Sequence, residues 1–225
     1  RSHLALWRQR RDEVGQWIPN LLKGFERGSD EIHVVSSDQW LKGGVQSWES
    51  GGIHYHCFKS GIPLLGRPWP ARLPVDHLTR FWVNRRRIRA IVDRVRPDII
   101  HLFGVENPQY GAAVLDLLGH YPVLVTIQGF IHRERQYHDT MITRVRCRYE
   151  EALLRACSAF SGDYESEGVV RSFNPDVSYE HLYFPVNEAL IARTPKGLDL
   201  AYDLLFVGAL TRQKGFADYL EIVRR

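Results

Sequence analysis

The chain has 225 residues, of which 44% are hydrophobic and 25% charged, values typical of a globular, soluble protein. No run approaches the roughly 20 apolar residues of a membrane span, and no signal peptide is evident. We therefore do not expect the chain to be an integral membrane protein. The net charge of +4 leaves three kinds of anionic partner open: nucleic acid, an anionic membrane surface or an anionic substrate.

The N-terminal part alternates between predicted strands and helices. Residues 61–74 hold four prolines and predict a loop, whereas apolar residues at helical spacing predict one long helix over 76–95 with its arginines facing outward. Two glycine pairs, at 43–44 and 51–52, predict turns or bulges. The other predicted elements here are a strand over 3–7, a helix over 14–25 and strands over 31–36 and 53–58.

Residues 97–130 predict a strand–helix–strand unit around which the rest of the chain is organised. Two short apolar runs, 99–103 and 123–127, are bounded by proline and glycine, as are strands that are covered on both faces. The segment 107–119 between them has the apolar spacing of a helix. We therefore expect an α/β fold: a Rossmann-like, mainly parallel sheet with helices on both faces.

The C-terminal part continues the alternation of strands and helices, and a second domain with the same alternation then begins. We expect helices over 140–157 and 166–172, strands over 159–162 and 177–182, and a polar loop over 132–139. A buried strand over 204–208, a glycine loop and a helix from Phe216 then open a second Rossmann-like domain. The predicted domains are 1–187, a linker over 188–202, and a truncated domain over 203–225.

Ligands of such sheets bind beyond the carboxyl ends of the strands. Here those ends carry Glu106 and Asn107 after one strand, and Gln128, Gly129 and His132 after the next. Asn107 and Gln128 have competing interpretations as capping residues, and His132 as an ordinary loop histidine. His101 lies within a strand, and we expect it to be a core histidine with its hydrogen bonds satisfied.

Four stretches resemble family 4 retaining glycosyltransferases of the GT-B fold. Val14-Gly15-Gln16-Trp17-Ile18 resembles the glycine turn near the start of that family, and Pro97-Asp98-Ile99-Ile100-His101 its "PDIIH" strand. Val125-Thr126-Ile127-Gln128-Gly129 resembles its "T-x-H-G" strand end, with glutamine in place of histidine. Residues 206–215, FVGALTRQKG, resemble "FVGRLxxxKG" at the opening of the donor domain, with Ala209 at the arginine position.

The resemblance implies transfer of a sugar from a nucleotide diphospho-sugar to a saccharide or lipid-linked acceptor, in surface polysaccharide or glycolipid synthesis. It implies that Lys214 contacts the donor diphosphate, with Gly208 and Gly215 permitting close backbone approach and Arg212 as a substitute cation. The implied acceptor and cleft residues are Gly15, Gln16, Glu106, Asn107, Gln128, Gly129 and His132. Gly15 has a competing interpretation as a turn at the start of its helix. The catalytic residues stay unassigned.

We expect no cofactor and no metal, because ten histidines and three cysteines are scattered without ligand spacing. Unpaired cysteines predict a cytoplasmic protein, and the arginine clusters suggest the inner membrane face as an alternative location. Catalysis requires both domains, so we expect this chain alone to be inactive. The competing hypotheses are a GT-B sugar-nucleotide epimerase or hydrolase, or a basic module that binds a membrane or nucleic acid. Binding of nucleic acid is disfavoured, because the sequence lacks the motifs of nucleic-acid-binding proteins.

Overall fold

The computed structural model describes residues 17–25, 28–38, 41, 43–60, 75–136, 139–182, 185–186, 188–193, 203–208, 210 and 214–224. The strand predicted over 3–7 and three predicted site residues, Gly15, Gln16 and Arg212, lie outside these ranges. The chain divides into two units, Trp17–Pro185 and a second made of residues 1–16 and 186–225.

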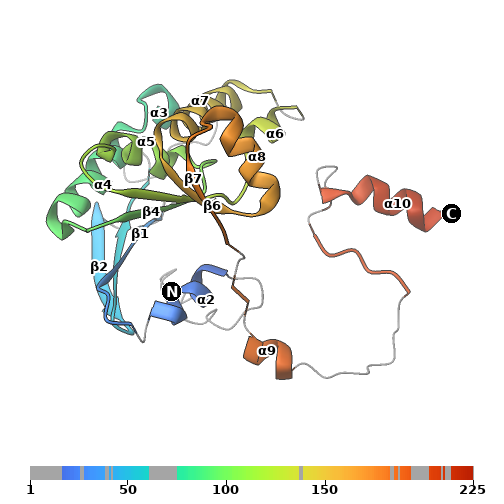
Figure 1. Ribbon diagram of the computed structural model, residues 1–225, viewed down its shortest axis with the longest axis horizontal. Helices are drawn as coiled ribbons and strands as arrows, with labels where there is room; N and C mark the ends of the chain where they lie inside the picture. The colour runs from blue at the N-terminus through green and yellow to red at the C-terminus, as the bar shows by residue number, and fades with distance from the viewer. Residues whose placement is uncertain are drawn as a thin grey trace. The chain divides into compact units, whose positions relative to one another are not determined.

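A four-stranded, all-parallel sheet forms the centre of the larger unit and confirms the predicted α/β class (Figure 1). Its order is β4 (Ile100–Phe103), β5 (Val123–Thr126), β6 (Ala159–Gly162) and β7 (Ser178–His181). The longest helix of each connection is, in turn, α5 (Pro108–Leu117), α7 (Met141–Ala156) and α8 (Tyr164–Phe173). Such crossover helices are what parallel strands require, and the arrangement is Rossmann-like.

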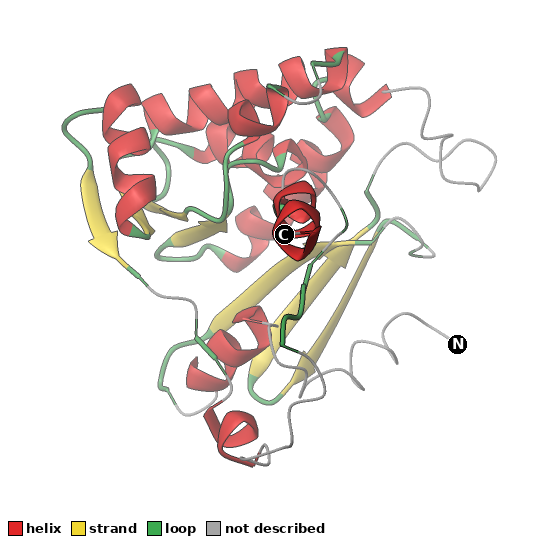
Figure 2. Cartoon of the chain, turned by 90° about the vertical axis from the view of Figure 1, so that its right-hand side faces the viewer, coloured by secondary structure: helices red, strands yellow, loops and turns green. Residues whose placement is uncertain are grey.

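The helices pack on the sheet through an apolar core, and Figure 2 shows helices above the strands. Leu102, Val125 and Phe160 are register neighbours on one face and belong to one buried cluster. Val114 of α5 and Leu153 of α7 belong to the same cluster. This cluster accounts for the apolar residues along one face of β4, β5 and β6.

A second, three-stranded sheet contains β1 (Ile32–Ser37), β3 (Ile53–Phe58) and β2 (Val45–Ser50), in that order. Strand β1 is parallel to β3, and β2 is antiparallel to it. The sequence did not predict β2. Gly51 and Gly52, with φ of 64° and 73°, form the two-residue hairpin that joins β2 to β3. Helix α2 (Trp17–Phe25) packs on this sheet through Leu22.

The predicted helix over 76–95 is wrong in one respect, because it is interrupted. Helix α3 (Val75–Leu78) ends before a turn in which Arg80 and Phe81 have φ of 53° and 57°, and α4 (Trp82–Val95) then begins. The turn buries Phe81, which packs edge-on against Tyr149 at 5.5 Å. Leu78 and Trp82, two apolar residues on either side of this turn, are exposed.

Two further predictions are corrected. Residues 132–139 were expected to be a loop, but α6 (Ile131–Arg135) forms there. Residues 204–208 were expected to be a buried strand, but they have no strand assignment, and Val207 is 86% exposed. A strand needs a neighbouring strand for its backbone hydrogen bonds. The smaller unit also contains α9 (Glu188–Arg193) and α10 (Phe216–Arg224).

No helix in the described part of the chain has both the length and the apolar character needed to cross a bilayer.

Candidate functional site

The carboxyl ends of the parallel strands meet at one edge of the four-stranded sheet. The register pairs Phe103 of β4 with Thr126 of β5, and Thr126 with Ser161 of β6. The segments that follow these strands therefore leave the sheet at a common edge, which is where open α/β sheets bind ligands. These segments are 104–107, 127–132 and 163–166.

Helix α7 holds two of these segments through side chains that lie one turn apart. Arg146 donates from Nε and Nη2 to the carbonyl oxygen of Glu106, at 3.2 and 3.0 Å. Glu150 accepts hydrogen bonds from the backbone N–H groups of Ile131, at 2.5 Å, and His132, at 3.1 Å. Residues four apart share one helix face, so α7 brings the segment after β4 and the segment after β5 together.

The Glu150 side chain is fully buried, and its contacts explain how a carboxylate is tolerated there. Its two oxygens accept the first N–H groups of α6, which helix geometry leaves without partners inside the helix. A third contact joins Oε1 to His132 Nδ1 at 2.7 Å. The carboxylate thus caps α6 and fixes the orientation of the His132 ring.

The contact with Glu150 decides which nitrogen of His132 faces a ligand. A carboxylate only accepts hydrogen bonds, so Nδ1 carries the proton and donates it. In the neutral ring this leaves Nε2 as the acceptor atom. The His132 side chain is 34% exposed, and its ring lies 5.2 Å from that of Phe130. An oriented, accessible imidazole acceptor suits a hydroxyl donor on a ligand.

Charged side chains surround this histidine at the same edge. Arg133 Nη1 lies 2.8 Å from Glu165 Oε1, and its guanidinium lies over the Phe130 ring at 5.4 Å. Asp163 begins α8 by accepting a hydrogen bond from Ser166 N–H at 2.7 Å. Hydrogen bonds from Ser166 lower the pKa of Asp163, so this carboxyl is ionised at neutral pH. The edge therefore presents both a cation and anions.

The other predicted acceptor residues differ in what they do. Asn107 caps α5 through a bond from Gln109 N–H at 3.1 Å, so its interpretation as a cap is confirmed. The Glu106 carboxylate lies against Gly104, whose φ of 83° and whose lack of a side chain make room for it. Gln128 is exposed and adjoins Gly129. A Cβ placed at Gly129 meets no described atom within 4 Å, so packing does not require this glycine.

A polar ladder runs across the sheet just before this edge. His101 Nε2 lies 2.6 Å from Thr126 Oγ1, which lies 2.7 Å from Ser161 Oγ. Burial lowers the pKa of His101 to about 4, so the ring is neutral at physiological pH. His101 is thus a partly buried histidine within the sheet, and its Nε2 has a hydrogen-bond partner.

The predicted donor residues lie in the smaller unit. Gly208 and Lys214 are exposed, and Gly215, with φ of 76°, accepts a backbone hydrogen bond from Tyr219 at the start of α10. The Phe206 ring lies 5.2 Å from that of Tyr219, so the segment before the glycine loop packs on α10.

Glu150 is not among the site residues predicted from the sequence, although the sequence holds a signal for it. Glu150 lies three residues after Cys147 and four before Leu154, and both of these are buried on α7. A carboxylate at helical spacing within an inward-facing apolar row requires a buried partner.

No protein-family model and no curated protein matches this chain.

Proposed function

We propose that this chain is the acceptor-side part of a glycosyltransferase, which moves a sugar from a nucleotide diphospho-sugar to a saccharide or lipid-linked acceptor. The observation that carries the proposal is the His132–Glu150 pair at the carboxyl edge of the parallel sheet. The products of this glycosyltransferase would be surface polysaccharides or glycolipids. The four motif stretches in the sequence support the same activity.

In this proposal the sheet edge binds the hydroxyl groups of the acceptor. His132 Nε2 accepts a hydrogen bond from one hydroxyl, and Glu150 stabilises any positive charge that the ring gains. The exposed amide of Gln128 donates to a second hydroxyl oxygen. The carboxylate of Glu106 is a further acceptor, at the end of the neighbouring strand.

The donor side of the proposal rests on the glycine loop before α10. Lys214 precedes the N-terminus of this nine-residue helix, where backbone N–H groups and the helix dipole favour an anion. We assign the donor diphosphate to Lys214 and Arg212, with Gly208 and Gly215 allowing its close approach. No metal takes part in this scheme.

The arginine clusters favour a structural role over binding of a membrane or nucleic acid. Arg85 forms a bidentate ion pair with Asp116, and Arg87 donates a hydrogen bond to the carbonyl oxygen of Lys59. Arg144 pairs with Asp139 in the same way. Arginines that are engaged locally offer less charge to phosphates. An epimerase or hydrolase shares the expected layout, and analysis of the reaction product separates it from a transferase.

Saturation-transfer NMR tests the acceptor site with this chain as it stands. The probes are a panel of methyl glycosides and the UDP, GDP and ADP derivatives of glucose. We expect at least one glycoside to receive saturation, and His132→Ala to weaken that binding about tenfold, the loss expected for one hydrogen bond of about 1.4 kcal/mol. We also expect no sugar transfer by this chain alone.

The matched control is His120→Ala, because His120 is an exposed histidine in the turn that precedes β5. This turn lies at the opposite, amino end of the strands, so the control should bind as the unaltered chain does. The proposal is wrong if no glycoside and no nucleotide sugar binds, or if the two variants bind equally well.

A further inference from the structure

A second polar cluster lies on one face of the three-stranded sheet. Ile53 and Tyr55 of β3 pack in the cluster that includes α2, so the residues that alternate with them, His54 and His56, occupy the opposite face. The register pairs His33 of β1 with His54. Strand pairing, which sequence spacing does not reveal, brings these histidines together.

The carboxylate of Glu31, just before β1, reaches both histidines. Its Oε1 lies 3.0 Å from His33 Nε2 and 3.8 Å from His54 Nε2. The candidate ligand atoms of the three residues all lie within 4.8 Å of one another. Two nitrogens and one carboxylate oxygen from neighbouring positions therefore meet at one point of the sheet.

We propose that Glu31, His33 and His54 form a binding site for a divalent transition-metal ion, with Zn²⁺ as the ion of choice. Nitrogen and carboxylate ligands bind Zn²⁺ at roughly 2.0–2.2 Å, so two ligand atoms of a tetrahedral site are about 3.3–3.5 Å apart. The two distances from Glu31 lie on either side of this range. Three protein ligands leave the fourth position for water or a ligand.

The partners of each imidazole also suit a metal ligand. Metal-bound histidines usually donate their other ring N–H to a fixed acceptor. His33 Nδ1 lies 2.9 Å from His56 Nε2, and His56 Nδ1 lies 2.9 Å from Ser47 Oγ. These two hydrogen bonds hold the His33 ring in place, and His56 Nε2 is the acceptor for the His33 Nδ1–H. His54 Nδ1 lies 3.9 Å from Glu49 Oε2, which is beyond hydrogen-bond distance, so this carboxylate serves the second ring only after a small movement of the Glu49 side chain, which is 61% exposed.

Coordination requires one local movement. The rings of His33 and His54 are stacked, with centroids 4.7 Å apart and planes 16° from parallel. The His54 ring must tilt so that its Nε2 lone pair points at the same ion as that of His33. The His54 side chain is 35% exposed and that of Glu31 is 73% exposed, so these two can adjust without disturbing the core.

Calorimetric titration of Zn²⁺ into the metal-free chain tests the proposal. We expect one ion per chain, and affinity about tenfold or more weaker in both Glu31→Gln and His54→Gln, each of which keeps the size of the side chain near that of the ligand it replaces. Co²⁺ should give the visible absorption of tetrahedral coordination in the unaltered chain and lose it in both variants.

His120→Ala is again the control, because it removes an exposed histidine from outside the cluster, and its affinity for Zn²⁺ should not change. Circular dichroism without metal checks that each variant is folded. If His54→Gln does not fold, Glu31→Gln decides alone, since the Glu31 side chain is largely exposed. The proposal is overturned if the unaltered chain binds no Zn²⁺, or if the ligand variants bind as tightly as the control.

Discussion

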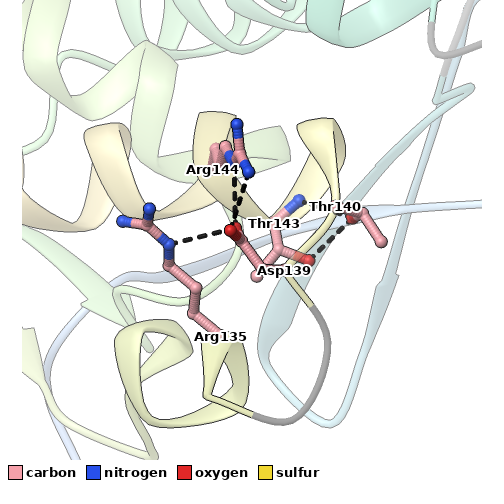
Figure 3. Close-up of polar contacts among 5 residues, drawn as sticks. All are labelled: Arg135, Asp139, Thr140, Thr143 and Arg144. Atoms are coloured by element: carbon pink, nitrogen blue, oxygen red, sulfur yellow. Dashed lines mark hydrogen bonds and ion pairs between the residues drawn. The ribbon is translucent and has the colours of Figure 1, made fainter.

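Two carboxylates near helix α7 make similar contacts in opposite surroundings. Asp139, just before the helix, binds Arg135 at 3.1 Å and Arg144 at 2.9 and 2.7 Å (Figure 3). Glu150, within the helix, binds two backbone N–H groups and His132. The Asp139 side chain is 41% exposed, whereas that of Glu150 has no exposed surface.

The difference shows why the number of contacts does not measure their importance. Water replaces the partners of an exposed carboxylate at little cost, and salt screens its charge. The Glu150 carboxylate is fully buried, so we expect the donors around it to depend on that one side chain. We therefore expect the buried carboxylate to hold the site together and the exposed one to contribute little to stability.

The largest expected effect is that of Glu150→Ala. It leaves the Ile131 and His132 N–H groups without acceptors and opens a cavity, which should lower the free energy of unfolding by on the order of 3 kcal/mol. Urea denaturation measures this loss. Glu150→Gln keeps the shape and one acceptor oxygen, so it should lose less. A loss below about 1 kcal/mol for Glu150→Ala would show that water reaches these donors.

The comparison extends to a largely buried base, His101, whose titration should have the second-largest effect on stability. Burial lowers its pKa from 6.5 to about 4, so between these values the unfolded chain binds a proton more readily than the folded one. The unfolding free energy should therefore fall as the pH drops from 6.5 to 4. Partial exposure reduces the effect to roughly 2 kcal/mol.

Denaturation at a series of pH values measures the His101 effect. His101→Leu removes the titrating group and leaves Thr126 its contact with Ser161. The slope of stability against pH should then flatten in this window. An unchanged slope would assign the pH dependence to other groups.

The ion pair of Arg85 and Asp116 is intermediate between the two carboxylates. It joins α4 to α5 through Nε at 2.6 Å and Nη2 at 2.5 Å, and the two side chains are 34% and 28% exposed. A bidentate, half-buried ion pair should contribute about 1 kcal/mol to the free energy of unfolding. A double-mutant cycle with Asp116→Asn and Arg85→Gln measures the coupling, and a value near zero would place this pair with the exposed ones.

Much of the fold follows from local patterns in the sequence. The apolar runs at 99–103 and 123–127 predicted β4 and β5, and Asn107 with Gly119 marked the ends of the helix between them. Strand β2 was missed because it is mostly exposed and so has no strict alternation of apolar residues. The break at Phe81 was missed because the turn contains neither glycine nor proline, and tertiary packing of the ring favours it.

The candidate site was predictable where residues directly follow a strand. Gln128, Gly129 and His132 met this condition, because the edge of a parallel sheet is fixed by strand direction. Glu150 did not, since it reaches the edge from a helix 18 residues further along the chain. The Glu31–His33–His54 cluster depends on the pairing of β1 with β3, and the sequence predicted both strands but not their register.

The smallest expected effect is that of Asp139→Asn. Hydrogen bonds from Arg144 and Arg135 lower the pKa of Asp139 to about 2, so any stabilisation is present above the unfolded value of 3.8 and is lost as the pH falls toward 2. Since the group is exposed, we expect no resolvable change in unfolding at neutral pH. Carbon NMR should place the Asp139 titration near 2 in low salt. Salt or Arg144→Gln should move it toward 3.8, because both weaken the attraction of the guanidinium. A titration near 3.8 in the unaltered chain, or destabilisation as large as that of Glu150→Ala, would contradict the contrast between the two carboxylates.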